Sequence, residues 1–555
     1  MTTRSMLAAT THPSDNTELP RRAWFRLQLP TAATFSLFLL LPLLGAETLS
    51  AQTYQDLFNF VGTPGGCCPQ YPSVMAQGRD GNLYGITSTG GANRVGAIFK
   101  ITPLGILTTL FSFDTSHGKT PVGGLVLGTD GNLYGTAEFG GDDGYGNIFK
   151  ITPAGVLTVL YNFTGVADGG YPVAPLVIGF DGNFYGTSYP GVAFRLSPAG
   201  VFTVLAKIPT VSYGPLLQAR NGAFYGVTQF GGTHSAGTVY RIAGTAVTTL
   251  YNFDGTHGSY PIGGLVEGAD GNLYGTTTAG GATNAGVIFR ITPAGALTVL
   301  ISFDSVHPLG GWQAYAGLIA GNDGSLYGST VWGGLAGYGV IFKMTTGGAY
   351  TKLWDFAAPG GDGVYATPLE HTSGEIFGLT ERGGTAGKGV VFSFNDGVAP
   401  FALLNIRAGV VGKTVGILGS GLSGTSRVTF NGTPASFTVV SNTYLTAKVP
   451  SGETGFVTVT TPSGTLLSSK IFKVIPTITG FTPTTGTVGD SVILTGTGLI
   501  QASAITVGGV KVTAFTVNSD QQVTFRIPAG AATGKVVLTT PGGGATSSTV
   551  FTVTP

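Results

Sequence analysis

The sequence predicts an all-β protein, a seven-bladed β-propeller followed by two immunoglobulin-like β-sandwiches. One sequence unit occurs seven times in the first two thirds of the chain. The seventh copy lacks its last strand, and a matching strand precedes the first copy. The last third of the chain contains two similar units in which apolar and polar residues alternate. No segment shows the 3.6-residue apolar period of a helical repeat, so strands are expected throughout.

The composition is typical of a folded chain of many short strands. The 555 residues are too many for one core, and they include 92 Gly and 30 Pro, yet 42% of the chain is hydrophobic. Only 10% of the residues are charged, and the formal net charge is +1. This balance argues against electrostatic capture of nucleic acid, so no nucleic-acid partner is expected.

Residues 1–51 are predicted to be a signal peptide. Arg21, Arg22 and Arg26 precede an apolar run over residues 32–46, which is short for a membrane-spanning helix. Cleavage after Ala51 would place the mature protein outside the cytoplasm, secreted or at the cell surface, in an extracellular or periplasmic location. The alternative is an uncleaved membrane anchor, which would be the chain's contact with a membrane.

The repeated unit is marked by the motif Asp-Gly-Asn-Leu-Tyr-Gly. Its copies are separated by 50, 51, 40, 49, 53 and 50 residues, a period typical of propeller blades or solenoid arrays. The motif and its variants begin at Asp80, Asp130, Asp181, Asn221, Asp270, Asp323 and Ser373. Because the Tyr and the Asp of the motif recur in nearly every unit, we interpret them as packing and turn residues rather than as catalytic groups.

Each unit is predicted to hold four strands. In the second unit these are residues 124–128, 133–138, 147–152 and 156–163. Asp130-Gly131 is expected to form a tight hairpin turn with positive φ at both residues. The seventh unit ends after its third strand at residues 390–394, and residues 54–60 supply the missing fourth strand. Such an exchange closes a propeller ring, whereas a β-solenoid has no need of it.

These motifs resemble the GloVer tandem-repeat family of bacterial exported proteins over residues 53–397. The pattern runs from the Asp-Gly-Asn-Leu-Tyr-Gly motif through Ile-Phe-Lys-Ile-Thr-Pro to Leu-Thr-Val-Leu-Tyr-Asn-Phe. The resemblance implies export and surface display, and it implies no catalytic residues. We therefore assign residues 52–397 to the propeller.

The carboxy-terminal units resemble IPT/TIG domains, an immunoglobulin-like family. Both contain a Gly-x-Val-Gly run, at residues 409–412 and 486–489, and a Gly-x-Gly-Leu run, at residues 419–422 and 496–499. Both also share a Thr-Pro turn, at Thr461-Pro462 and at Thr540-Pro541. Alternating runs such as residues 455–460 suit strands with one buried face. The domains are expected at residues 398–474 and 475–555. In bacterial surface proteins the resemblance implies spacers or adhesive modules.

One face of the propeller is the candidate binding face. The turns between the first and second and the third and fourth strands are short and uniform, and they share one face. The loops between the second and third strands share the other face with the links between blades, and they are long and variable. Function tends to lie on variable loops held by a rigid scaffold.

Four residues of the sixth unit are the candidate ligand-binding residues on that face. Trp312 and His307 lie in the link before the unit, and Trp332 lies in its second loop with Tyr338 close behind. An exposed pair of indoles could form a platform for stacking against a sugar ring. The alternative is that both indoles pack locally.

Histidine and cysteine give no clear metal site. His117, His257 and His307 recur at one position of the links, which repeat inheritance explains better than metal binding. Cys67 and Cys68 are adjacent, so they could form a vicinal disulfide in an oxidising compartment, with two separate thiols as the alternative. No metal, cofactor or catalytic residue is expected.

The predicted function is that of an exported, non-catalytic binding or adhesion protein. The propeller would recognise an extracellular ligand, a carbohydrate or a cell-surface protein, with the sandwiches as spacers. Two alternatives remain: a secreted propeller enzyme acting on a polysaccharide or lactone, and a structural protein of the cell envelope. Convergent carboxylates or histidines around the axis would favour the enzyme.

Overall fold

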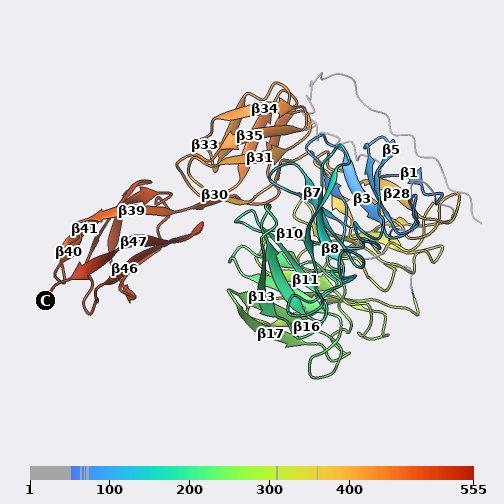
Figure 1. The fold of residues 1–555 in the computed structure, drawn as a ribbon, viewed down its shortest axis with the longest axis horizontal. Coiled ribbons are helices and arrows are strands. Elements are labelled where there is room, and N and C mark those ends of the chain that lie inside the picture. Colours follow the sequence, from blue (N-terminus) through green and yellow to red (C-terminus); the bar gives the residue numbers. More distant parts are fainter. Residues whose placement is uncertain (1–51, 63–65, 68, 70–73, 308–309, 359) are drawn as a thin grey trace, which may run out of the picture. The chain divides into compact units, whose positions relative to one another are not determined.

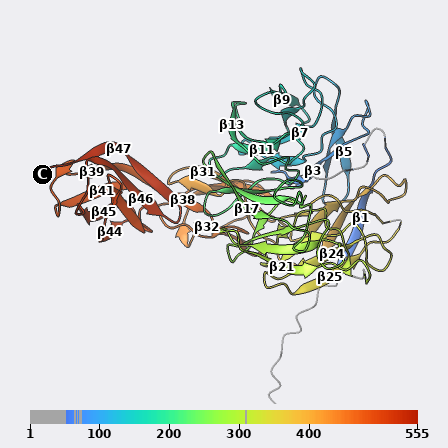
Figure 2. The same ribbon diagram turned by 90° about the horizontal axis from the view of Figure 1, so that it is seen from below.

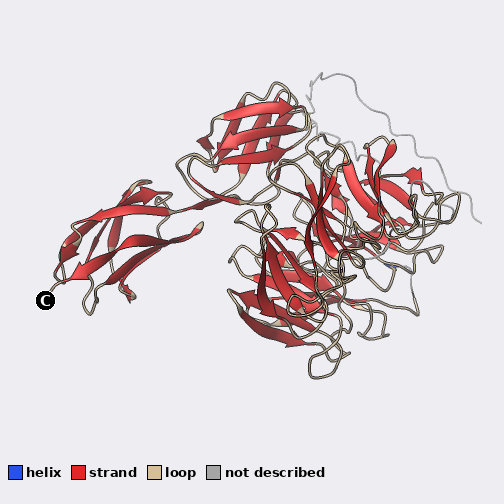
Figure 3. Ribbon diagram, viewed as in Figure 1, coloured by secondary structure: helices blue, strands red, loops and turns tan. Residues whose placement is uncertain are grey.

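The computed structural model describes residues 52–62, 66–67, 69, 74–307, 310–358 and 360–555. Its regular elements are all strands, so the fold class is all-β as predicted (Figure 3). In these ranges no helix is long and apolar enough to cross a membrane. The predicted signal peptide, residues 1–51, lies outside the described residues.

The repeat region forms seven four-stranded antiparallel sheets in the described part of the chain (Figure 1). We number them in chain order and call them the repeat sheets. The first three are β2 (Ala76–Gln77), β3 (Leu83–Thr87), β4 (Ala97–Ile101) and β5 (Leu107–Ser112); β6 (Leu125–Leu127), β7 (Leu133–Ala137), β8 (Asn147–Ile151) and β9 (Leu157–Asn162); β10 (Val177–Ile178), β11 (Phe184–Ser188), β12 (Val192–Leu196) and β13 (Phe202–Lys207). The next three are β14 (Leu217–Gln218), β15 (Phe224–Thr228), β16 (Thr238–Ala243) and β17 (Ala246–Asn252); β18 (Val266–Glu267), β19 (Leu273–Thr276), β20 (Val287–Ile291) and β21 (Leu297–Ser302); β22 (Ile319–Ala320), β23 (Leu326–Ser329), β24 (Val340–Met344) and β25 (Tyr350–Asp355). The seventh combines β26 (Leu369–Glu370), β27 (Ile376–Leu379) and β28 (Val390–Asn395) with β1 (Thr53–Asn59).

The amino-terminal strand completes the last sheet, as predicted. β1 pairs antiparallel with β28, from Thr53 opposite Asn395 to Asn59 opposite Val390. Figures 1 and 2 show the blue β1 among the yellow strands of the last repeats. Tyr54 of β1 stacks on Trp354 with 4.9 Å between ring centroids, so the strand is also held to the sixth sheet.

The turn chemistry differs in one respect from the prediction. Gly131 has a positive φ of 90°, but Asp130 does not lie in the left-handed region. The Asp130 carboxylate instead accepts the backbone N–H of Asn132 at 3.1 Å. The turn is longer than a two-residue hairpin, since Leu127 pairs with Leu133 across it. One Gly in the left-handed region and an Asp side-chain hydrogen bond reverse the chain, in place of two left-handed residues.

The motif tyrosines pack between the sheets, as predicted. Tyr134 is fully buried, and its ring stacks on Phe184 of the next sheet with 4.0 Å between centroids. Its hydroxyl donates to the Asp130 carboxylate at 2.8 Å. The hydrogen bond satisfies the one polar atom of a large buried side chain, and the same pair recurs as Tyr84 with Asp80.

Each pair of successive sheets shares an apolar core, and one such core joins the seventh sheet to the first. That core contains Phe377, Leu379 and Val391 of the seventh sheet together with Leu83 and Phe99 of the first. Six further cores each join one pair of successive sheets, from the first and second sheets to the sixth and seventh. The repeat sheets therefore form a closed series in which every sheet has a neighbour on each side.

A second contact crosses four of these junctions. A Gln or Glu that ends the first strand of one sheet accepts the backbone N–H that precedes the turn of the sheet before it. These bonds join Gln218 to Phe180 at 2.8 Å, Glu267 to Arg220 at 3.0 Å, Glu370 to Asn322 at 3.0 Å and Gln77 to Thr372 at 3.0 Å. The last of them joins the first sheet to the seventh, where the buried His371 also contacts the Gly81 carbonyl at 3.1 Å.

Two β-sandwiches follow the repeat sheets. The first contains β29 (Leu403–Leu404), β30 (Ala408–Val410), β31 (Thr414–Leu418), β32 (Arg427–Phe430), β33 (Thr433–Pro434), β34 (Phe437–Ser441), β35 (Tyr444–Lys448), β36 (Val457–Thr461), β37 (Gly464–Leu467) and β38 (Lys473–Ile475). The second contains β39 (Thr477–Thr482), β40 (Thr485–Gly486), β41 (Ser491–Thr497), β42 (Ala504–Val507), β43 (Val510–Lys511), β44 (Phe515–Ser519), β45 (Gln522–Arg526), β46 (Gly534–Thr540) and β47 (Gly543–Val553). Each sandwich has its own apolar core between two main sheets.

The first sandwich contacts the short turns of the repeat sheets. Arg407 donates to the Gln218 carbonyl at 3.2 Å, and the Thr443 hydroxyl donates to the Arg79 carbonyl at 2.8 Å. The Arg79 guanidinium lies 4.5 Å from the centroid of the Tyr444 ring. We call the side of the repeat sheets that carries these turns the turn face. The first sandwich is therefore held against this face by hydrogen bonds and a cation–π contact.

Removing β1 is expected to destabilise the repeat sheets. Deletion of residues 52–60 exposes the edge of β28 and removes Phe60, which is fully buried in the core between the seventh and first sheets. We expect a loss of at least about 3–5 kcal/mol in the free energy of unfolding, the cost of truncating one buried Phe. The melting temperature of the deletion variant is compared with that of a chain lacking only residues 1–51. Equal melting temperatures would contradict closure by β1.

Glu370 is expected to make stability depend on pH. Burial raises the pKa of Glu370 from 4.5 to about 7; Asp323 raises it further, whereas the Asn322 N–H and Lys470 lower it. Between these pH values the folded protein holds a proton that the unfolded chain releases, so the free energy of unfolding falls as the pH rises. Glu370→Gln keeps the acceptor for Asn322 and loses the titration. Relative to the unsubstituted protein, the melting temperature of the variant should therefore increase from pH 4.5 to 7; a constant difference would refute the assignment.

Candidate functional site

The variable loops and the links between sheets lie together, as predicted. In the described residues, short bridges pair six of the seven links with the loop that follows the second strand, as in Lys119 with Phe139 and Ser259 with Ala279. Backbone hydrogen bonds of 2.8 Å hold both of these pairs. We call this side of the repeat sheets the loop face.

The backbone of the links is the same in several units, while the side chains differ. In four links the residue after the bridge is not glycine and still has a positive φ: 53° at Thr120, 50° at Tyr171, 57° at Tyr260 and 56° at Gln313. Non-glycine residues adopt this conformation only where the surroundings impose it. The recurring geometry is thus a property of the scaffold, and the choice of side chain at this position differs from one link to the next.

The two tryptophans of the sixth unit are brought together, as predicted. Trp312 and Trp332 form one of the bridges, and their rings stack with 6.3 Å between centroids and 29° between planes. Both side chains are half-buried, and Trp312 packs against the core between the fifth and sixth sheets. The pair therefore contributes to packing and also presents part of its surface on the loop face.

The other two candidate residues of this unit lie elsewhere. The His307 side chain is 82% exposed, and its Nδ1 lies 3.0 Å from the Asp304 carboxylate of its own loop. Tyr338 packs against the core between the sixth and seventh sheets, on the far side of the sixth sheet from Trp312. His117 and His257 have the same kind of Asp partner, at 2.8 Å each. This repeated local contact accounts for the spacing of the three histidines.

A pocket lined by aromatic side chains opens on the loop face beside the second, third and fourth sheets. It has a volume of about 250 Å³ and is lined by Glu138, Phe139, Tyr171, Val173, Tyr189, Val211 and Tyr213. Tyr171 meets Phe139 at 5.3 Å, Tyr145 at 5.5 Å and Tyr189 at 6.3 Å between centroids, each time edge to face. The Tyr189 side chain is 52% exposed. The rings therefore line a cavity, and the exposed Tyr189 ring is open to a ligand.

Glu138 places a carboxylate in this aromatic pocket. Burial raises the pKa of Glu138. Burial is also the main cause of the raised pKa of Tyr213, and the charge of Glu138 adds to that shift. Across the described residues, no protein donor is bonded to this carboxylate. A half-buried acceptor without a donor is available to the hydroxyl groups of a ligand.

A pair of carboxylates, Asp362 and Glu381, lies in the link and the loop of the seventh sheet. Asp362 forms a bridge with Arg382, and Glu381 precedes that arginine. Burial raises the pKa of both carboxylates, while Arg382 opposes the shift. Tyr365 beside them pairs edge to face with Tyr315 at 5.1 Å. Within the described ranges, no group of three or more His, Cys, Asp or Glu side chains is arranged to hold a metal ion.

The vicinal disulfide stays a prediction. Cys67 Sγ lies 3.1 Å from the Thr89 hydroxyl, in the bridge that joins the first link to its loop. Cys68 lies outside the described residues.

The aromatic pocket was not predicted from the sequence. A usable signal exists, since Phe139, Tyr171, Tyr189 and Tyr213 occur at link and loop positions whose residues vary among the units, unlike the constant motif tyrosines. Part of the set recurs once, with Phe230 and Tyr260 at the positions of Phe139 and Tyr171. They lie 18 to 32 residues apart in three units (139 to 171, 171 to 189 and 189 to 213 give 32, 18 and 24). Only the packing of successive sheets brings them together.

Family models account for most of the described chain. The Gloeobacter/Verrucomicrobia repeat matches residues 46–194 and 188–310, and the IPT/TIG domain matches residues 404–470 and 476–553. No curated protein matches the sequence.

Several solved structures show a partial likeness to this chain. A virginiamycin B lyase from Staphylococcus aureus is 16% identical, with 62% of this chain and 99% of the lyase covered at a TM-score of 0.44. A fungal alcohol oxidase of the AA5 family, in complex with copper, is 14% identical. The match covers 75% of this chain and 100% of the oxidase, at a TM-score of 0.42. A surface glycan-binding protein from Prevotella bryantii is 18% identical. The match covers 28% of this chain and 39% of the glycan-binding protein, at a TM-score of 0.21. Likeness at this level supports no conclusion about what this chain binds.

The predicted repeat and the predicted carboxy-terminal domains are thus both matched by family models, and the sheets and sandwiches agree with them. The chain therefore contains Gloeobacter/Verrucomicrobia repeats over residues 46–310, followed by two IPT/TIG domains.

Proposed function

We propose that this protein binds carbohydrate on the loop face of a seven-bladed propeller. The closed series of seven repeat sheets supports the propeller, since each sheet would be one blade. The observation that carries the function is the aromatic pocket, in which several rings surround an open carboxylate. Aromatic rings stack on the apolar faces of sugars, and carboxylates accept their hydroxyl groups.

The size of the aromatic pocket indicates how much of a saccharide it holds. Its volume of about 250 Å³ is slightly below the roughly 300–1,000 Å³ of pockets for drug-sized ligands. It suits one sugar unit, with the rest of a longer chain lying across the loop face. The Trp312–Trp332 pair on the same face is a second platform in this proposal.

Export and surface display complete the proposal. The predicted signal peptide agrees with a protein that meets its ligand outside the cytoplasm. The second IPT/TIG domain would act as a spacer or adhesive module. The first would hold the turn face, which leaves the loop face for the ligand.

The aromatic pocket is tested with the mature protein on an array of neutral oligosaccharides, followed by calorimetric titration of the best-bound one. Tyr171→Ala and Glu138→Gln should each weaken binding by about 1–3 kcal/mol, the scale of binding hot spots. Phe230→Ala, an exposed aromatic on the loop face outside this pocket, is the matched control and should bind normally. No binding on the array, or equal effects of all three variants, would reject the pocket. Release of reducing ends from the oligosaccharide would favour the alternative, a propeller enzyme.

The tryptophan pair is tested in the same titration. Trp332→Ala should weaken binding by about 1–3 kcal/mol with a small change in melting temperature. Trp312→Ala should in addition lower the melting temperature, because Trp312 packs against the core of the fifth and sixth sheets. Unchanged binding by both variants would show that the pair serves packing alone.

A further inference from the structure

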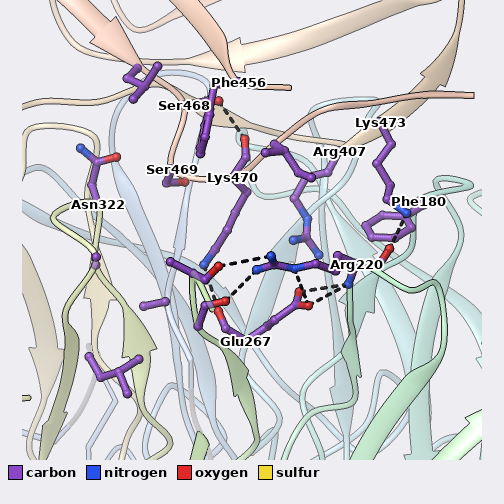
Figure 4. A pocket seen from close by; sticks show the side chains of 18 residues that line it. Phe180, Arg220, Glu267, Asn322, Arg407, Phe456, Ser468, Ser469, Lys470 and Lys473 are labelled. Atoms are coloured by element: carbon purple, nitrogen blue, oxygen red, sulfur yellow. Dashed lines mark hydrogen bonds and ion pairs between the residues drawn. The ribbon is translucent and has the colours of Figure 1, made fainter. Parts of the chain in front are cut away.

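A second pocket lies between the turn face and the first IPT/TIG domain. It has a volume of about 360 Å³ (Figure 4). The repeat sheets contribute Phe180, Arg220 and Glu267, and the IPT/TIG domain contributes Arg407, Lys470 and Lys473. We call it the junction pocket. It is separate from the loop face, and its lining has a different chemistry.

Positive charge is in excess in the junction pocket. Two arginines and two lysines line it, and Glu267 is the one carboxylate among its lining residues. Glu267 is already paired, since its Oε1 lies 2.8 Å from Nε of Arg220 (Figure 4). The nearby Glu370 has a pKa raised to about 7, so it supplies only part of a negative charge at neutral pH.

In the described chain, the three cations of the IPT/TIG domain contact carbonyl oxygens and an aromatic ring directly, and the Glu267 carboxylate acts on all three through its charge. Lys470 Nζ lies 3.4 Å from the Glu267 carbonyl, and Lys473 donates to the Arg220 carbonyl. Arg407 donates to Gln218. Arg407 and Lys473 each lie 5.1 Å from the centroid of the Phe180 ring. In the described chain, none of the three forms a salt bridge.

Such an arrangement is costly without an anion. Buried charges are normally paired, and a carbonyl or ring contact offsets only part of the lost hydration. Burial and the neighbouring Arg407 lower the pKa of Lys470 to about 8, and burial lowers the pKa of Lys473, while the charge of Glu267 opposes both shifts without cancelling them. An oxyanion between these groups would provide the missing charge and accept several charge-assisted hydrogen bonds.

We propose that the junction pocket binds the oxyanion group of a small ligand, a carboxylate, sulfate or phosphate, held by Arg407, Lys470 and Lys473. The carbon skeleton of such a ligand would lie against Phe456 and Leu467, which also line the pocket. Because both domains supply the lining, the bound anion would hold the first IPT/TIG domain on the turn face and stabilise the folded chain by mass action.

The probes for this proposal are sodium sulfate, sodium phosphate and sodium glucuronate, each titrated into the mature chain at constant ionic strength. At least one probe should bind by calorimetry and raise the melting temperature, and the probe that does so identifies the oxyanion. Lys470→Met should weaken that binding about 10- to 100-fold, the value of a hydrogen bond to a charged group. Lys448→Met, an exposed lysine of the same domain, is the matched control and should bind as the unsubstituted protein does.

The melting temperature without anion separates a binding role of Lys470 from a bracing role. Lys470→Met removes an unpaired, desolvated charge, so the variant should melt no lower than the unsubstituted protein when anion is absent. It should also gain less on adding the anion. Three results would overturn the proposal: no probe binds, Lys470→Met binds as tightly as Lys448→Met, or Lys470→Met melts lower without anion.

Discussion

The pairing of β1 with β28 is the constraint on which the rest of the structure depends. Each repeat sheet buries its apolar faces only against its two neighbours, so an open series would leave two such faces in water. The amino-terminal strand fills the edge of the seventh sheet, and Phe60 enters the core that joins this sheet to the first. The loop face and the turn face are fixed in shape only because this series is closed.

The two faces differ because their connections differ. On the loop face the links and loops are long, their backbone is held by bridges, and their side chains vary, which allows aromatic residues from several units to gather around Tyr171. On the turn face the connections are short and present carbonyl groups, which accept hydrogen bonds from Arg407, Lys470 and Lys473. One face is thus suited to a neutral ligand with apolar surfaces, and the other to a basic domain and an anion.

Much of the fold could be predicted because it is encoded locally. The strands of the second unit, the exchange of the amino-terminal strand and the packing role of Tyr134 follow from alternation, turn residues and a missing repeat element. The turn at Asp130 was predicted with the wrong backbone, since a side-chain hydrogen bond replaced a second left-handed residue. The Trp312–Trp332 pair was predictable because both residues belong to one unit.

The sequence by itself determined the class of fold, the repeat and the domain families, because period, alternation and motif residues act over a few neighbouring positions. The tertiary structure alone decided which side chains meet across units and domains. Tyr171 reaches Tyr189 only through the packing of successive sheets, and Lys470 reaches Glu267 from 203 residues away. Such contacts depend on how sheets and domains pack. A local sequence pattern extends over a few neighbouring residues, so it cannot specify which residues far apart in the chain come into contact.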